Sequence, residues 1–113
     1  MKIYHNNRCR KSREALEIIK SQQKDFKVIE YLKEKLSNKE ISSILTKLKL
    51  KPIDLVRTNE VVWKEKYKNK KLTDTDIINI MADNPRLIQR PIIITKNKAI
   101  LGRDIKKVID LFN

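Results

Sequence analysis

The chain has 113 residues, of which 40% are hydrophobic and 36% are charged. This length suits one compact domain and is too short for two ordinary ones. No apolar run approaches the roughly 20 residues that a membrane span needs, and the N-terminus lacks the apolar stretch of a signal peptide. A single cysteine excludes a disulfide scaffold and, with no export signal, predicts a protein of the reducing cytoplasm.

The chain is strongly basic, with 27 Lys and Arg residues against 14 Asp and Glu residues and a formal net charge of +13. Such a field could attract nucleic acid, an acidic protein surface or a small anion. Most of the excess is lysine, which equally fits a general preference for Lys on solvated surfaces. Arginine is more informative, because an Arg retained in a Lys-rich background suggests that its planar fork of donors matters. Three arginines lie within four residues of the only cysteine, Cys9: Arg8, Arg10 and Arg13.

The first third of the chain predicts a strand, a helix and a second strand, at residues 2–5, 10–21 and 26–32. This order is typical of two parallel strands joined by a helical crossover.

The middle of the chain predicts a mostly helical insert. Ser37 and Glu40 form a capping box that opens a helix with an amphipathic stripe. After Pro52, a helical turn at 53–56 leads to Arg57, and a weaker helical pattern follows at 61–67. Thr73 caps a last helix of the insert, which ends before Pro85.

The C-terminal part predicts strands at 92–95 and 98–101 joined by a turn at Lys96-Asn97, and then a helix at 104–112. The residues expected to face the sheet from this helix are Ile105, Val108, Ile109 and Phe112. The whole chain, residues 1–113, is therefore predicted to be a single α/β domain. Its four-stranded mixed sheet would be built from βαβ and then ββα, with the helical insert at about 38–86.

Cys9 lies in the loop between the first strand and the first helix. The first amides of a helix are unpaired and partly positive, so they lower the pKa of a thiol beside them and also bind tetrahedral oxyanions. Arg8, Arg10 and Lys11 add cations, and Ser12 offers a hydroxyl. The pattern predicts a reactive thiolate in an anion site. The alternative is an inert, buried cysteine.

Other chemistry has less support in the sequence. His5 is the only histidine, and it could either modulate the thiolate or serve as a structural hydrogen-bonding group. One His and one Cys make neither a metal cluster nor a convincing Cys-His-Asp triad, so no metal is expected. Pro91 precedes an apolar strand, which fits either a cis peptide bond or an ordinary strand start.

Four segments together resemble the glutaredoxin-type arsenate reductase family. Residues 4–13, YHNNRCRKSR, are similar to its active-site loop, H-N-P-x-C-x-x-S-R, and residues 87–93, LIQRPII, to its L-I-x-R-P-I segment. Gly102-Arg103 and residues 55–57, LVR, match two further segments in the same order. The resemblance spans the chain and implies a thioredoxin-like fold with a helical insert and a cis bond at Arg90-Pro91.

The resemblance also implies a function. Cys9 would attack arsenate and form a covalent adduct, with Arg57, Arg90 and Arg103 holding the oxyanion. Glutathione, as co-substrate, and glutaredoxin would supply electrons, arsenite would be released, and no cofactor would stay bound. That dependence fits a chain with one cysteine, because any resolving thiol must come from outside. In an arsenic-resistance enzyme of this type, six further residues would support the site: His5, Asn6, Arg8, Ser12, Arg13 and Pro91.

Two residues depart from the family pattern. Asn7 replaces the usual proline two positions before the cysteine, which predicts a looser loop. Asp104 replaces the proline that usually follows Arg103. It could pair with Arg103 and weaken it as an oxyanion donor, but we expect it to be simply the N-terminal residue of the last helix.

The sequence leaves three other functions open. One is a thiol oxidoreductase of the same fold that acts on glutathione mixed disulfides or another oxyanion. Another is an Spx-type regulator that binds RNA polymerase, although Cys9-x-x-Ser12 excludes the C-x-x-C switch, and His5-Asn6 and Arg57 favour the reductase. The third is a nucleic-acid binder, which the charge allows but for which no reader motif or aromatic platform is apparent. No membrane partner is expected.

Overall fold

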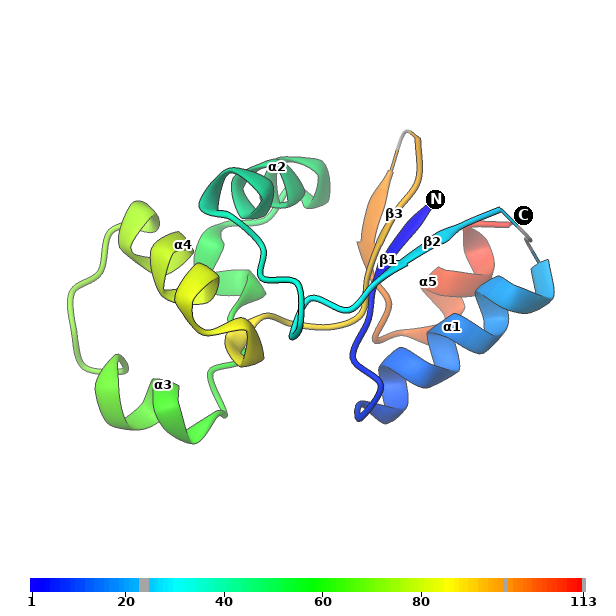
Figure 1. Ribbon diagram of the computed structural model, residues 1–113. Helices are drawn as coiled ribbons and strands as arrows, with labels where there is room; N and C mark the ends of the chain where they lie inside the picture. Colours follow the sequence, from blue (N-terminus) through cyan, green and yellow to red (C-terminus); the bar gives the residue numbers. More distant parts are fainter. Residues whose placement is uncertain (23–24, 97, 113) are drawn as a thin grey trace. The chain divides into compact units, whose positions relative to one another are not determined.

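The computed structural model of the chain describes residues 1–22, 25–96 and 98–112. The chain divides into two compact units, one formed by Met1–Glu34 with Arg90–Asn113 and the other by Lys35–Gln89 (Figure 1). None of the helices in the described parts is long and apolar enough to cross a membrane.

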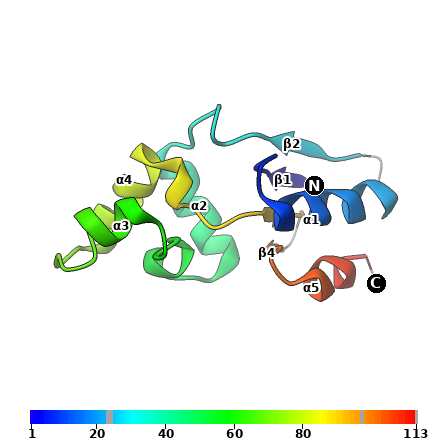
Figure 2. The same ribbon diagram turned by 90° about the horizontal axis from the view of Figure 1, so that it is seen from below.

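The first unit contains the sheet and two helices. Its elements are β1 (Lys2–Tyr4), α1 (Arg10–Gln22), β2 (Lys27–Ile29), β3 (Ile92–Ile94), β4 (Ala99–Leu101) and α5 (Ile105–Asp110). The strand order is β2-β1-β3-β4, with β1 parallel to β2 and antiparallel to β3, and β3 antiparallel to β4. Figure 2 shows this unit from below, with α1 and α5 beside the strands. The predicted four-stranded mixed sheet, βαβ followed by ββα, is confirmed.

The core of this unit forms where both helices cover one face of the sheet. Ile3 and Ile93 are paired across β1 and β3 and are fully buried with Ala15 and Ile19 of α1 and Val108 of α5. The prediction that Ile109 also faces the sheet is wrong, since its side chain is 45% exposed. Each residue of a helix turns by about 100°, so the residue after the inward-facing Val108 is carried toward solvent.

The second strand is shorter than predicted. β2 covers residues 27–29 rather than 26–32, because the chain turns directly after it, where Lys33 N donates to Glu30 O at 2.9 Å. The alternation that continues through Tyr31 belongs to this turn, in which Tyr31 is fully buried. The predicted turn at Lys96-Asn97 includes Asn97, which lies outside the described residues.

The second unit is the predicted helical insert, and its limits extend the expected 38–86 by three residues at each end. It comprises α2 (Asn38–Leu48), η1 (Pro52–Leu55), α3 (Val61–Lys66), α4 (Asp74–Asp83) and η2 (Pro85–Leu87). Both predicted caps are confirmed: Ser37 and Glu40 form a capping box on α2, and Thr73 caps α4 together with Asp76. The helices α2 and α4 pack together over buried apolar side chains that include Ile41, Ile44, Leu45, Ile77 and Met81.

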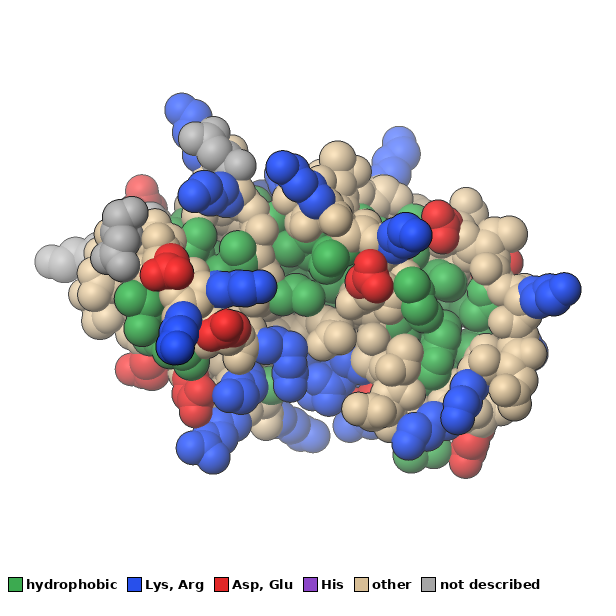
Figure 3. Space-filling model, turned by 180° about the vertical axis from the view of Figure 1, so that it is seen from behind, with side chains coloured by type: hydrophobic (Ala, Val, Ile, Leu, Met, Phe, Trp, Pro, Cys, Tyr) green, Lys and Arg blue, Asp and Glu red, His purple; other side chains and the backbone are tan. Residues whose placement is uncertain are grey.

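Exposure separates the lysines from two of the arginines. All described lysines are exposed, and on the face drawn in Figure 3 the basic side chains lie among acidic and hydrophobic ones. Arg57 and Arg90, by contrast, are partly buried. Burying part of a guanidinium is costly unless it has partners, so these two arginines are the ones whose surroundings indicate a specific role.

Gly102, the only glycine, is expected to be intolerant of a side chain. A Cβ at this position would lie 2.9 Å from Pro91 Cγ and 3.0 Å from Ile93 Cδ1. Because those atoms belong to a packed core, Gly102→Ala should lower the free energy of unfolding by about 1–3 kcal/mol, measured by urea unfolding. Ala99→Gly, in the neighbouring strand, is the comparison. An unchanged midpoint for Gly102→Ala would contradict the crowding.

Candidate active site

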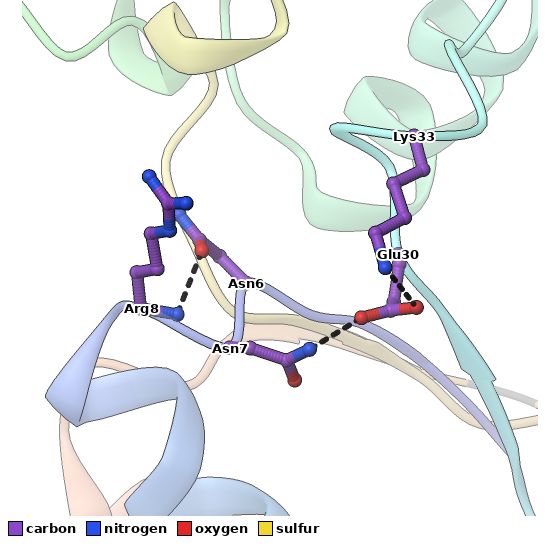
Figure 4. Close-up of polar contacts among 5 residues, drawn as sticks. All are labelled: Asn6, Asn7, Arg8, Glu30 and Lys33. Carbon is purple, nitrogen blue, oxygen red and sulfur yellow. Dashed lines mark hydrogen bonds and ion pairs between the residues drawn. The ribbon is translucent and has the colours of Figure 1, made fainter.

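The loop between β1 and α1 presents Cys9 at the start of a helix. Cys9 N donates to Asn6 O at 3.0 Å, and Cys9 O accepts from Arg13 N at 3.0 Å, which is the first turn of α1. Asn6 tightens the loop further, because its Oδ1 accepts from Arg8 N at 3.0 Å (Figure 4). The thiol is partly exposed. It is therefore placed where the unpaired amides of a helix start can reach it.

Several groups act on the ionisation of Cys9, with opposite signs. Burial raises the pKa of the thiol, but it is outweighed by hydrogen bonds from the backbone of Ser12 and Lys11 and by the hydrogen bond and charge of Arg90. The net effect is a lowered pKa. A lowered folded-state pKa means that ionisation of Cys9 contributes stability that is present above the unfolded pKa and is lost as the pH falls through the folded one.

The cation that acts on Cys9 differs from the one expected. Arg8, Arg10 and Lys11 were expected to supply the positive charge, but the guanidinium beside the thiol is that of Arg90, two residues before β3. Arg10 is exposed and pairs with Glu14 at 3.1 Å, and Lys11 acts through its backbone amide. Adjacent residues on a helix point in different directions, so closeness in sequence did not place those side chains at the sulfur.

Ser12 also acts differently from expectation. Its hydroxyl was expected to serve the thiol, but Ser12 Oγ lies 2.6 Å from His5 Nδ1 and accepts from Asn6 N at 3.1 Å. Both Ser12 and His5 are almost completely buried. Burial lowers the pKa of His5, while a hydrogen bond with Asn7 and the charge of Glu30 oppose this effect. The side chains of His5 and Ser12 thus form a buried polar contact. The backbone of Ser12, and not its hydroxyl, stabilises the thiolate.

Ser12→Ala should therefore affect stability more than thiol chemistry. Losing Oγ leaves Asn6 N and His5 Nδ1 without this buried partner, so the free energy of unfolding should fall by about 1–3 kcal/mol. The pKa of Cys9 should change little, because the amide remains. Urea unfolding and the pH profile of thiol alkylation measure the two quantities. A large rise in the thiol pKa with unchanged stability would show that the hydroxyl serves Cys9 directly.

Arg90 acts on the thiol, and Arg103 is joined to the backbone of Arg90. The Arg90-Pro91 peptide bond is cis, as the resemblance implies. Arg103 Nη1 donates to Arg90 O at 3.0 Å, while the Arg90 side chain bonds with Cys9. Asp104 caps α5 by accepting from Lys106 N at 3.0 Å, so the expectation that it begins the last helix is confirmed.

Arg57 belongs to the second unit. Its N donates to Leu87 O at 2.7 Å, and its Nε forms an ion pair with Glu60 Oε1 at 3.1 Å. The sequence analysis did not single out Glu60, although an acidic residue three positions after Arg57 could have indicated this ion pair. The approach of Arg57 to the oxyanion site stays a prediction.

The described residues contain no group of three or more His, Cys, Asp or Glu side chains that could hold a metal ion. A family model decides the classification, because that of the ArsC family matches residues 4–111. The chain belongs to the ArsC family. This assignment agrees with the resemblance drawn from the loop around Cys9.

Relatives of this ArsC chain match it over nearly its full length. It is 34% identical to the uncharacterized protein YfgD of Escherichia coli (strain K12), covering 98% of this chain and 95% of that protein. It is 32% identical to the arsenate reductase of Neisseria meningitidis serogroup A, covering 96% of this chain and 94% of that one. The solved arsenate reductase from Vibrio cholerae has a TM-score of 0.89 and 33% identity, with 97% of each chain covered. The predicted thioredoxin-like fold is confirmed.

Proposed function

We propose that this ArsC-family protein reduces arsenate to arsenite, using glutathione and glutaredoxin and a covalent adduct on Cys9. The observation that carries the proposal is the position of the Cys9 thiol, held by helix-start amides and the Arg90 guanidinium in a state that favours the thiolate. A thiolate is the nucleophilic form of cysteine, and donors that favour it also favour a bound oxyanion.

The chemistry begins with attack of Cys9 Sγ on arsenic. A sulfur–arsenic bond forms, and one oxygen leaves as water after protonation. Reduction of As(V) to As(III) needs two electrons, which two thiols supply when they join as a disulfide. Arsenate and two thiols thus give arsenite, one disulfide and one water.

The second thiol must come from another molecule, because the chain has only one cysteine. Glutathione suits this role as a small co-substrate, and the mixed disulfide then formed on Cys9 would be returned to the thiol by glutaredoxin and a further glutathione.

The arginines would bind and orient the substrate. The proposal for Arg90 is supported by its bond to the nucleophile, and that for Arg103 by its bond to the Arg90 carbonyl. Arg57 is proposed as the third donor. Its Nε is committed to Glu60, which leaves the two terminal nitrogens of the fork for arsenate. A guanidinium fork can donate to two oxygens of a tetrahedral oxyanion at once, whereas a lysine ammonium acts as a point charge.

The test is a coupled assay containing the purified protein, glutathione, glutaredoxin, glutathione reductase and NADPH. Arsenate-dependent loss of NADPH supports the proposal, and omitting glutathione or glutaredoxin should each stop turnover. Turnover that continues without glutaredoxin would contradict that part of the proposal. Absence of any turnover with arsenate, alongside reduction of a glutathione mixed disulfide, would replace it with a thiol oxidoreductase acting on another substrate.

A further inference from the structure

We propose that Glu30 is a positioning residue for the thiol loop, acting through Asn7, whose side chain it holds. The inference rests on the proposed nucleophilic role of Cys9. It concerns a contact between the residue that follows β2 and the loop that follows β1.

The central contact is drawn in Figure 4, where the side chain of Asn7 points toward the carboxylate of Glu30. Asn7 Nδ2 donates to Glu30 Oε1, and Glu30 Oε2 lies 3.6 Å from Lys33 Nζ. The backbone of Asn7 is held as well, because Asn7 O accepts from Arg13 Nη1 of α1 at 2.9 Å. Asn7 is thus held both by Glu30, which follows β2, and by Arg13 of α1.

The attachment continues inward to the helix start. The side chain of Asn7 hydrogen-bonds with His5, and His5 Nδ1 lies 2.6 Å from Ser12 Oγ. Ser12 in turn supplies a backbone hydrogen bond to Cys9. Asn7 lies two residues before Cys9 in the same loop, so holding Asn7 positions the sulfur against these amides through the backbone of the loop.

These contacts answer a question raised by the sequence. An asparagine has a free φ angle that a proline lacks, and Asn7 was expected to loosen the loop. The structure instead holds Asn7 by two side chains from outside the loop, Glu30 and Arg13. The side chain of Glu30 is 35% exposed and Asn7 is exposed, so their hydrogen bond competes with water and its effect on the thiol should be modest.

A charge effect and a positioning role predict opposite changes in the pKa of Cys9 when Glu30 is replaced. Removing a nearby negative charge favours any thiolate and would lower the pKa of Cys9. Loosening the loop moves the sulfur away from its amide donors and from Arg90, which would raise that pKa. The sign of the change therefore separates a positioning role from a general charge effect.

The experiment measures the second-order rate of alkylation of Cys9 by iodoacetamide across pH. The chain has no other thiol, so all labelling reports on this one. Glu30→Ala should raise the pH midpoint and slow alkylation at neutral pH by roughly three- to tenfold, the range of one partly exposed hydrogen bond. Asn7→Ala should change the profile in the same direction and by at least as much, since it removes this contact and the one with His5. The double variant should add little to Asn7→Ala, because the Glu30–Asn7 contact is already lost in it.

Two further variants are controls. Glu30→Gln keeps an oxygen that can accept from Asn7 Nδ2, so it should preserve most of the wild-type profile and guards against simple misfolding. Glu34→Ala removes the same charge from an exposed side chain in the adjacent turn and should leave the profile unchanged.

The inference is overturned if Glu30→Ala leaves the midpoint unchanged or lowers it, if Glu34→Ala shifts it equally, or if the two single effects add. Alkylation needs no arsenate, so this test is separate from that of the proposed function. If Glu30→Ala raises the midpoint as expected but the protein does not turn over arsenate, the positioning role stands and only the proposed substrate is rejected.

Discussion

Cys9→Ser is expected to abolish arsenate reduction, lowering the rate by about four orders of magnitude or more, as loss of a nucleophile does in other covalent enzymes. The reason is that a serine hydroxyl is not ionised under conditions where the Cys9 thiolate is favoured. The electron transfer also needs a sulfur that can form a disulfide. The measurement is NADPH consumption in the coupled assay, with arsenate varied.

The fold should survive this change. Oxygen is smaller than sulfur, the side chain is partly exposed, and the backbone bonds of Cys9 to Asn6 and Arg13 do not involve it. Circular dichroism and thermal unfolding should therefore match the wild type, apart from the pH-dependent stability that thiolate formation contributes. Labelling by iodoacetamide should fall from one group per chain to none. Turnover at the normal rate by Cys9→Ser would reject the covalent mechanism.

Local signals made most of the fold predictable. The capping residues Ser37 and Thr73 are encoded within four residues of the helices they begin, so they required no knowledge of the rest of the chain. The same holds for the apolar face of α1 and for the apolar run of β3. Errors arose where a local pattern has two structural outcomes: the alternation around Tyr31 suits a strand, but it forms a turn.

The site was less predictable, because its contacts join distant segments. The position of Cys9 at a helix start followed from its own neighbours. The resemblance implied Arg90 only as an oxyanion ligand, and no spacing in the sequence indicated its contact with the thiol. Ser12 contacts His5 through its hydroxyl and Cys9 through its backbone. These two contacts depend on the turn geometry of the loop. Glu30 carried no signal, since its partner Asn7 lies on another strand connection.

Arg90→Lys is expected to lower kcat/KM for arsenate by about 10- to 100-fold, the equivalent of losing one hydrogen bond to a charged group. The substitution keeps the positive charge but replaces a planar fork with a single ammonium group. Arg90 contacts the sulfur, and in the proposed mechanism it also directs donors toward the substrate oxygens. A point charge can serve one of these partners well but not both. The pKa of Cys9 should rise modestly, because the charge remains while the aligned hydrogen bond is lost.

Arg10→Lys is the matched control, since Arg10 also adjoins Cys9 in sequence but is exposed and paired with Glu14. It should leave both kcat/KM and the alkylation profile unchanged. Equal losses in the two variants would mean that the general positive field attracts arsenate and that guanidinium geometry does not matter. That result would be accompanied by a steep dependence on salt, because a long-range field is screened while a bond at the sulfur is not. A loss confined to Arg90→Lys and insensitive to salt would assign the effect to the fork itself.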